Sequence, residues 1–115
     1  MATFTKVKLS GSTNGRGIAV AATATLGTTI HAAHATALDE IWLYANNIHS
    51  SAVVLTVEFG GVTITSDLIQ TSIAATPSGL VLICAGLLVT GSVSVTAFAG
   101  TANKIELFGF VNRIA

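Results

Sequence analysis

The chain has 115 residues, and its five Lys and Arg residues balance its five Asp and Glu residues, so its formal net charge is zero. This length is typical of one domain with one core. Charged residues make up only 9% of the chain and hydrophobic residues 51%, whereas a soluble surface usually carries about 25–35% charged residues. Balanced charge excludes a strong field that attracts nucleic acid or an anionic membrane, and the shortage of charge predicts a subunit whose outer faces meet other subunits.

The N-terminal segment, residues 1–16, is predicted to be a strand or an extended arm followed by a loop rich in Gly, Ser and Asn. Residues 3–9 alternate in polarity, and the loop contains Asn14-Gly15, which favours a turn. The segment holds no continuous apolar run, so it does not look like a secretory signal. It carries Lys6, Lys8 and Arg16, three of the five basic residues, and we expect it to reach a partner.

Residues 17–115 are predicted to form the folded domain. Alternation with period two and β-branched residues recur along this segment, and no helical period is convincing. The expected strands are Ile18–Thr25, Thr28–Ala33, Ala37–Asn46, Val53–Phe59, Val62–Thr65, Asp67–Ile73, Gly79–Cys84, Gly91–Phe98 and Lys104–Ile114. Gly60-Gly61 is expected to close a hairpin between Val53–Phe59 and Val62–Thr65. Eight to ten short strands predict an all-β, single-domain, jelly-roll-like β-sandwich.

For three of these strands, the order of polar and apolar residues predicts which side chains share a face. In Ala37–Asn46, large apolar groups lie on both faces, which predicts a central strand that is covered twice. In Val53–Phe59, Leu55 and Val57 are expected to point inward, and Thr56 and Glu58 outward. In the last strand, the sequence places Ile105, Leu107 and Val111 on one face and Phe108 and Phe110 on the other. Two apolar faces on one strand predict burial against a neighbouring subunit, and hence a homo-oligomer.

The segment Gly79–Gly100 has no charged residue and is long enough to be considered as a membrane span. Gly86 and Gly91, together with the alternation of Ser and Thr with Val over residues 92–96, favour two short strands instead. Cys84 is the only cysteine. It lies in an apolar run, has no partner for an internal disulfide, and is predicted to be a small buried hydrophobe.

Catalytic chemistry has little support in the sequence. The chain lacks the G-x-S-x-G nucleophile elbow. Asp39 and Glu40 are neighbours on a predicted strand, so their carboxylates point to opposite faces, and we expect solvated side chains where the strand begins. Residues 14–17 lack the Lys-Ser/Thr of a phosphate-binding loop. The sequence predicts neither an enzyme nor a cofactor.

His31, His34 and His49 are the three histidines that could bind a metal. His31 and His34 are three residues apart, a spacing that suits a helix but sends side chains on a strand to opposite faces. His49 would be a distant third ligand, without a thiol or carboxylate pattern to support it. No metal site is predicted.

Aromatic and basic residues are the remaining candidates for function. Trp42 and Tyr44 suit either sugar stacking or packing in an interface, and packing is the favoured reading. We predict that the interface contains Lys6, Lys8, Arg16, Trp42, Tyr44, Phe108 and Phe110.

Several segments together resemble a known family: KVKLSGSTNGRGI, ALDEIWLYANN, LTVEFGG, SDLI, GLVLICAGLL and TANKIELFGFVNRI. Their order, over nearly the whole chain, resembles the small head decoration, or cement, proteins of tailed bacteriophages, which are encoded near the major capsid protein. The resemblance implies an all-β protein that is made in the host cytoplasm, sits on the outer capsid surface of the virion and binds the major capsid protein, commonly as a trimer. It implies no catalytic residue.

The sequence therefore predicts a structural protein that stabilises a bacteriophage capsid by binding across several capsid subunits. The alternative is a carbohydrate- or receptor-binding β-module of a phage tail or fibre, which would need Trp42 and Tyr44 to be accessible. A small β-barrel enzyme is the third possibility, and the chain lacks the convergent titratable groups that it would require.

Overall fold

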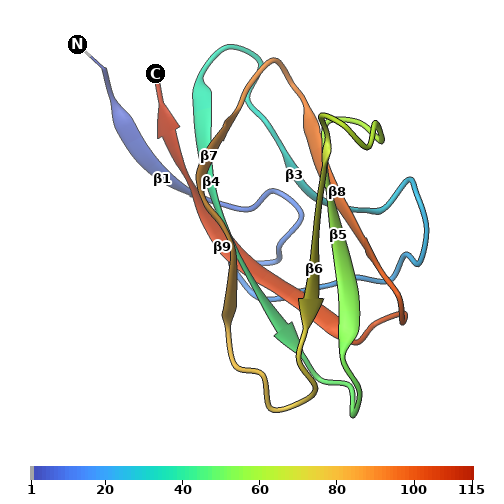
Figure 1. Ribbon diagram of the computed structural model, residues 1–115. Coiled ribbons are helices and arrows are strands. Elements are labelled where there is room, and N and C mark those ends of the chain that lie inside the picture. Colours follow the sequence, from blue (N-terminus) through green and yellow to red (C-terminus); the bar gives the residue numbers. More distant parts are fainter. Residues whose placement is uncertain (1) are drawn as a thin grey trace.

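A computed structural model describes residues 2–115, which form nine strands in two antiparallel sheets and no helix (Figure 1). Sheet A consists of β1 (Phe4–Lys8), β2 (Ile18–Ala19), β4 (Leu38–Asn47), β7 (Val81–Val89) and β9 (Ile105–Ile114). Sheet B consists of β3 (Thr28–Ala32), β5 (Val53–Phe59), β6 (Leu68–Ile73) and β8 (Ser94–Ala99). The all-β sandwich predicted from the sequence is confirmed.

The strand order follows a nested pattern. Sheet A has the order β1-β9-β4-β7, with β2 also on β9, and sheet B has the order β3-β8-β5-β6. The antiparallel pairs β1 with β9, β3 with β8, β4 with β7, and β5 with β6 nest from the chain ends toward the middle. The chain thus runs as one long doubled hairpin that is wrapped into two facing sheets, which is the jelly-roll arrangement.

The core lies between the sheets and comes from alternate residues of each strand. Ile41 and Leu43 of β4 meet Leu55 and Val57 of β5 in one cluster, and all four are fully buried. β4 lies between β9 and β7, so the prediction that Ala37–Asn46 is a central strand is confirmed. Its second face, with Trp42, is only half-buried within one chain.

The N-terminal segment belongs to sheet A in this structure. β1 pairs with β9 along its whole length, from Phe4 opposite Ile114 to Lys8 opposite Phe110, and the two termini lie side by side (Figure 1). Leu9, directly after β1, is 1% exposed and joins the core. Of the two forms expected for residues 1–16, strand or arm, the structure has the strand, followed by the loop that leads to β2.

One predicted strand is shorter in the structure, and another is absent. Instead of a strand over Ile18–Thr25, only Ile18–Ala19 forms a strand, because after Val20 the chain passes from sheet A to sheet B, where the Ala22 carbonyl accepts the Ala99 N–H. No strand forms over Val62–Thr65, so the expected hairpin at Gly60-Gly61 is wrong, and β5 pairs with β6 instead. The connecting loop is held by Asp67, whose carboxylate accepts a hydrogen bond from the Thr63 backbone N–H (3.0 Å).

β7 is longer than predicted. It continues through residues 85–89, which the sequence had suggested as a connection, because Gly86 adopts φ 75° and forms a bulge opposite β4. The charge-free segment Gly79–Gly100 therefore supplies β7 and β8. Within residues 2–115 the structure has no helix with the length and apolar character needed to cross a bilayer.

Thr56 and Glu58 lie on the face of β5 opposite the core residues Leu55 and Val57, as expected, but they are not open to solvent there. Thr56 is 1% exposed and receives a hydrogen bond from Gln70 of β6, and Glu58 is fully buried beneath Thr25 and Gly27 of the β2–β3 connection. The Glu58 carboxylate accepts hydrogen bonds from the Thr25 hydroxyl, the Gly27 N–H (2.8 Å) and the Thr96 hydroxyl (2.6 Å). Burial opposes ionisation, but these donors outweigh it and lower the pKa of Glu58.

Candidate interaction surface

The outer face of sheet A gathers the residues that the sequence singled out. Lys6 and Lys8 come from β1, Phe108 and Phe110 from β9, and Trp42 and Tyr44 from β4. In the strand register, Lys8, Phe110 and Trp42 form one row across the sheet, and Phe108 and Tyr44 form the next. We define these residues, with Arg16 at the margin, as the aromatic face.

Its centre is a stack that joins three strands. The rings of Trp42 and Phe110 are nearly parallel, with centroids 6.0 Å apart and an interplanar angle of 10°. The ammonium of Lys6 lies 4.6 Å from the centroid of the Phe110 ring, which is a cation–π geometry. These contacts fix the side chains of the face before any partner binds, which lowers the entropic cost of binding.

Both acidic side chains on this face have partners within the sheet. Glu40 accepts hydrogen bonds from Trp42 Nε1 (2.9 Å) and Asn112 Nδ2 (3.1 Å), which lower its pKa. Glu106 accepts a hydrogen bond from Asn46 Nδ2 (3.0 Å). The carboxylates therefore stabilise neighbouring side chains of the face and hold the Trp42 indole in place.

Arg16 reaches the margin of the aromatic face through a close approach of its loop. A shallow hollow is lined by Thr13, Arg16, Gly17, Glu106 and Phe108. A Cβ on Gly17 would lie 2.6 Å from Cζ of Phe108, so only glycine lets the loop pass this close to the ring. The loop thereby places the exposed Arg16 side chain beside Phe108.

Apolar side chains surround the aromatic face and remain uncovered in the single chain. Trp42, Tyr44, Phe108 and Phe110 are half-buried. The exposed neighbours from β1, β4 and β7 are Phe4 (71% exposed), Leu38 (41%), Leu82 (51%) and Leu88 (57%). An apolar sheet face of this kind is typical of an interaction surface.

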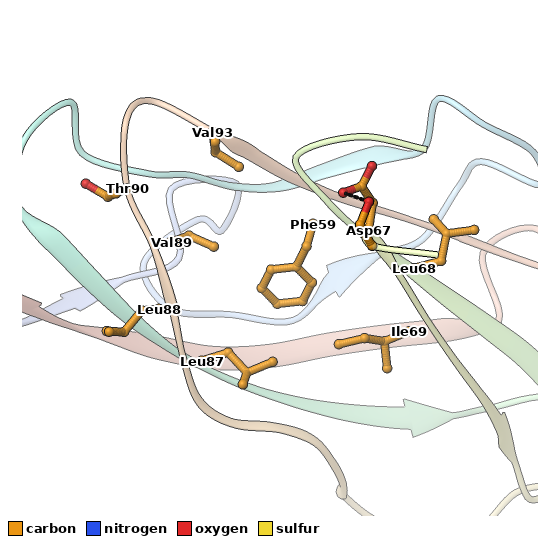
Figure 2. A pocket seen from close by; sticks show the side chains of 10 residues that line it. Phe59, Asp67, Leu68, Ile69, Leu87, Leu88, Val89, Thr90 and Val93 are labelled. Atoms are coloured by element: carbon orange, nitrogen blue, oxygen red, sulfur yellow. Dashed lines mark hydrogen bonds between the residues drawn. The ribbon is translucent and has the colours of Figure 1, made fainter. Parts of the chain in front are cut away.

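A second feature, which no sequence pattern predicted, is an apolar cleft between the edge strands β6 and β7. Its volume is about 450 Å³, and Figure 2 shows Phe59, Ile69 and Leu87 turned toward it. The remaining lining residues are Ser66, Asp67, Leu68, Leu88, Val89, Thr90 and Val93. The run of residues without charge at 79–100 was the available signal, but only the fold shows that part of this run forms a sheet edge.

Asp39 does not have the solvated position expected for it. It is fully buried and bridges the sheets, because His31 Nε2 on β3 donates to its Oδ2 (2.8 Å), and Arg113 on β9 also binds it. The other ring nitrogen of His31, Nδ1, accepts the Ser10 backbone N–H (3.1 Å). Although Ser10, His31 and Asp39 lie together, neither nitrogen of His31 is free to take a proton from the Ser10 hydroxyl, so the arrangement is a structural link between the sheets.

The other candidates for chemistry are separate from one another. Within residues 2–115, no three His, Cys, Asp or Glu side chains converge as metal ligands. His34 Nδ1 accepts backbone N–H groups of Thr36 (3.1 Å) and Ala37 (2.9 Å) and orders its own turn. Cys84 is buried, and burial raises the pKa of its thiol to about 11.

Comparison of the chain with protein-family models, with curated proteins and with solved structures gave no match.

Proposed function

We propose that the protein is a structural component of a bacteriophage virion that decorates the capsid and stabilises it by binding across major capsid protein subunits. The observation that carries the proposal is the aromatic face, on which basic and aromatic side chains from three strands and one loop are held together. The resemblance of the sequence to head decoration proteins suggests the identity of the partner.

The stabilising mechanism would be thermodynamic and not catalytic. Each bound copy removes apolar surface from water, which is favourable by about 25 cal/mol of free energy for each Å² buried. A protein that binds only the intact shell also stabilises that shell by mass action. The aromatic face suits this role because Trp42 and Phe110 are already ordered against each other. A homo-oligomer would engage several capsid sites at once, which multiplies weak individual contacts.

The alternative, a carbohydrate- or receptor-binding module of a tail or fibre, rests on Trp42 and Tyr44. Both side chains are half-buried. The Trp42 indole N–H is bound to Glu40, and its ring lies along Phe110. This arrangement favours a broad protein contact over a single sugar stacked on a free ring face.

The proposal is tested by co-sedimentation with undecorated heads assembled from the major capsid protein encoded in the same genome. We expect the wild-type protein to sediment with heads, and Trp42→Ala and Phe110→Ala to bind more weakly. Val54→Ala, on the outer face of sheet B, is the matched control because Val54 is an exposed apolar strand residue outside the aromatic face (49% exposed). Absence of head binding, with binding to a polysaccharide that is lost in Trp42→Ala, would favour the alternative.

A further inference from the structure

The two edges of sheet A differ in charge. β1, at one edge, carries Lys6 and Lys8 beside the exposed ring of Phe4. β7, at the other edge, contains no charged residue and borders the apolar cleft. Among the lining residues of the cleft that the structure describes, Asp67 is the one charged side chain. One edge is therefore basic, and the other is apolar with a single acidic group.

These two edges also lie at the same level along the strands. The register across sheet A places in one row Lys6, Asn112, Glu40 and Leu88. The next row consists of Val7, Val111, Ile41 and Leu87. β1 is thus level with residues 87–88 of β7, which border the cleft and follow the bulge at Gly86.

The shared level of the β1 and β7 edges matters because symmetry restricts which surfaces of two copies can meet. In a closed ring whose axis follows the strands, every copy lies at the same height, so an edge can meet only what lies level with it on the neighbouring copy. The β1 edge of one copy would then meet Leu87 and Leu88 of the next. A twofold contact of two β1 edges would instead bring the lysines of both copies together, which is unfavourable.

We infer that the protein assembles head to tail, with the β1 edge of one copy (Phe4–Lys8) docked against the β7 edge and the β6–β7 cleft of the next. Phe4 supplies the apolar anchor, and Lys6 and Lys8 bring positive charge to the side that carries Asp67. The contact uses strand edges, so most of the aromatic face stays available for the capsid. This inference rests on the proposed self-association and specifies its geometry.

The test uses two variants that each damage one side of the contact. Phe4→Asp removes the anchor, and Leu88→Asp places a charge beside the cleft. Phe4 and Leu88 are exposed in the single chain, so the variants are expected to fold, which circular dichroism and a cooperative melt would verify. Ile64→Asp is the control, because Ile64 is 82% exposed and lies outside both edges.

Native mass spectrometry and sedimentation then report the assembly. We expect the wild-type protein and Ile64→Asp to form a closed ring of more than two copies, and each edge variant to lose it. An equimolar mixture of the two edge variants should form a one-to-one heterodimer, because one intact β1 edge and one intact cleft remain. This heterodimer is specific to head-to-tail geometry.

Three outcomes would overturn the inference: a wild-type dimer, normal assembly of Phe4→Asp, or edge variants that stay monomeric when mixed. Binding of the same proteins to undecorated heads is measured in parallel. Head binding with wrong oligomer geometry would overturn only the inference, whereas loss of head binding by the wild-type protein would count against the proposed function itself.

Discussion

Asp39 on β4 and Arg113 on β9 form a two-pronged ion pair across neighbouring strands: Arg113 Nε lies 2.8 Å from Oδ1 of Asp39, and an Arg113 terminal nitrogen lies 3.0 Å from Oδ2. The two residues face each other in the strand register. Because Asp39 is also bound to His31 on the opposite sheet, one buried carboxylate joins sheet A to sheet B.

Replacing Asp39 with Asn should destabilise the fold by about 2–3 kcal/mol, because it removes the charged partner of the buried His31 and of Arg113, whose side chain is 27% exposed. Urea denaturation of the variant and the wild-type protein measures the difference. Glu106→Gln is the matched control on the same sheet. Because the Glu106 side chain is only half-buried, this substitution should lower the free energy of unfolding by less than about 1 kcal/mol. Equal losses in both variants would contradict the bridging role.

The same carboxylate predicts how stability depends on pH. Burial raises the pKa of Asp39, but hydrogen bonds from Arg113, His31 and the His34 N–H outweigh this, and the pKa falls from 3.8 to about 2. A group with a lowered folded-state pKa stabilises the protein above its unfolded pKa, and this contribution is lost as pH falls through the folded value. The contribution, about 2 kcal/mol, should therefore disappear between about pH 4 and pH 2.

Glu58, whose pKa is also lowered, should add to the loss of stability in acid. Chemical denaturation at a series of pH values measures the profile, and Asp39→Asn should flatten it. A wild-type stability that does not change between pH 5 and pH 2 would show that these carboxylates are not held as ionised partners in the fold.

Charge placed on the inner face of β5 should prevent folding. Leu55→Asp puts an unpaired carboxylate into the core, where Leu55 is fully buried. The matched control is Val54→Asp, one residue earlier and 49% exposed. Thr56 does not serve as the exposed control, because it is buried and its hydroxyl accepts a hydrogen bond from Gln70 (3.0 Å). Soluble, cooperatively melting Leu55→Asp protein would show that the faces of β5 are assigned wrongly.

Cys84 should react slowly with a thiol reagent in the native protein. Its side chain is buried, and the pKa of its thiol is raised to about 11, so both access and thiolate concentration are low at pH 8. Reaction with Ellman's reagent should become fast when urea unfolds the chain. Rapid labelling of the native protein would mean that the face of β7 toward the core is open to solvent.

The fold was predictable where alternation was strong. Apolar residues alternate along the middle of β4 (Ile41, Leu43, Ala45) and along β9 (Ile105, Leu107, Val111), and the structure places Leu43 and Leu107 in the core as expected. The grouping of Trp42 with Phe110 was not predictable from either strand alone. It depends on β9 being the neighbour of β4, a pairing between strands far apart in the sequence.

The errors have a common physical cause, which is tertiary contact that the local pattern does not contain. Glu58 looked exposed because it alternates with core residues, yet a loop more than thirty residues earlier supplies the donors that allow its burial. Asp39 looked solvated because it stands where a strand begins, although Arg113 pairs with its charge and His31 donates a hydrogen bond to it. At Gly86, a positive φ extends β7 where glycine had suggested a break.

The central claim, that the aromatic face is the surface covered on the capsid, is tested most directly by hydroxyl-radical footprinting of the protein, free and bound to undecorated heads. Trp42, the only tryptophan in the chain, is the reporter at the centre of the face, and Leu26, 70% exposed and outside the face, is the internal control. We expect the oxidation of Trp42 and Tyr44 to fall on binding and that of Leu26 to stay unchanged. Protection of Leu26 with unchanged oxidation of Trp42 would contradict it.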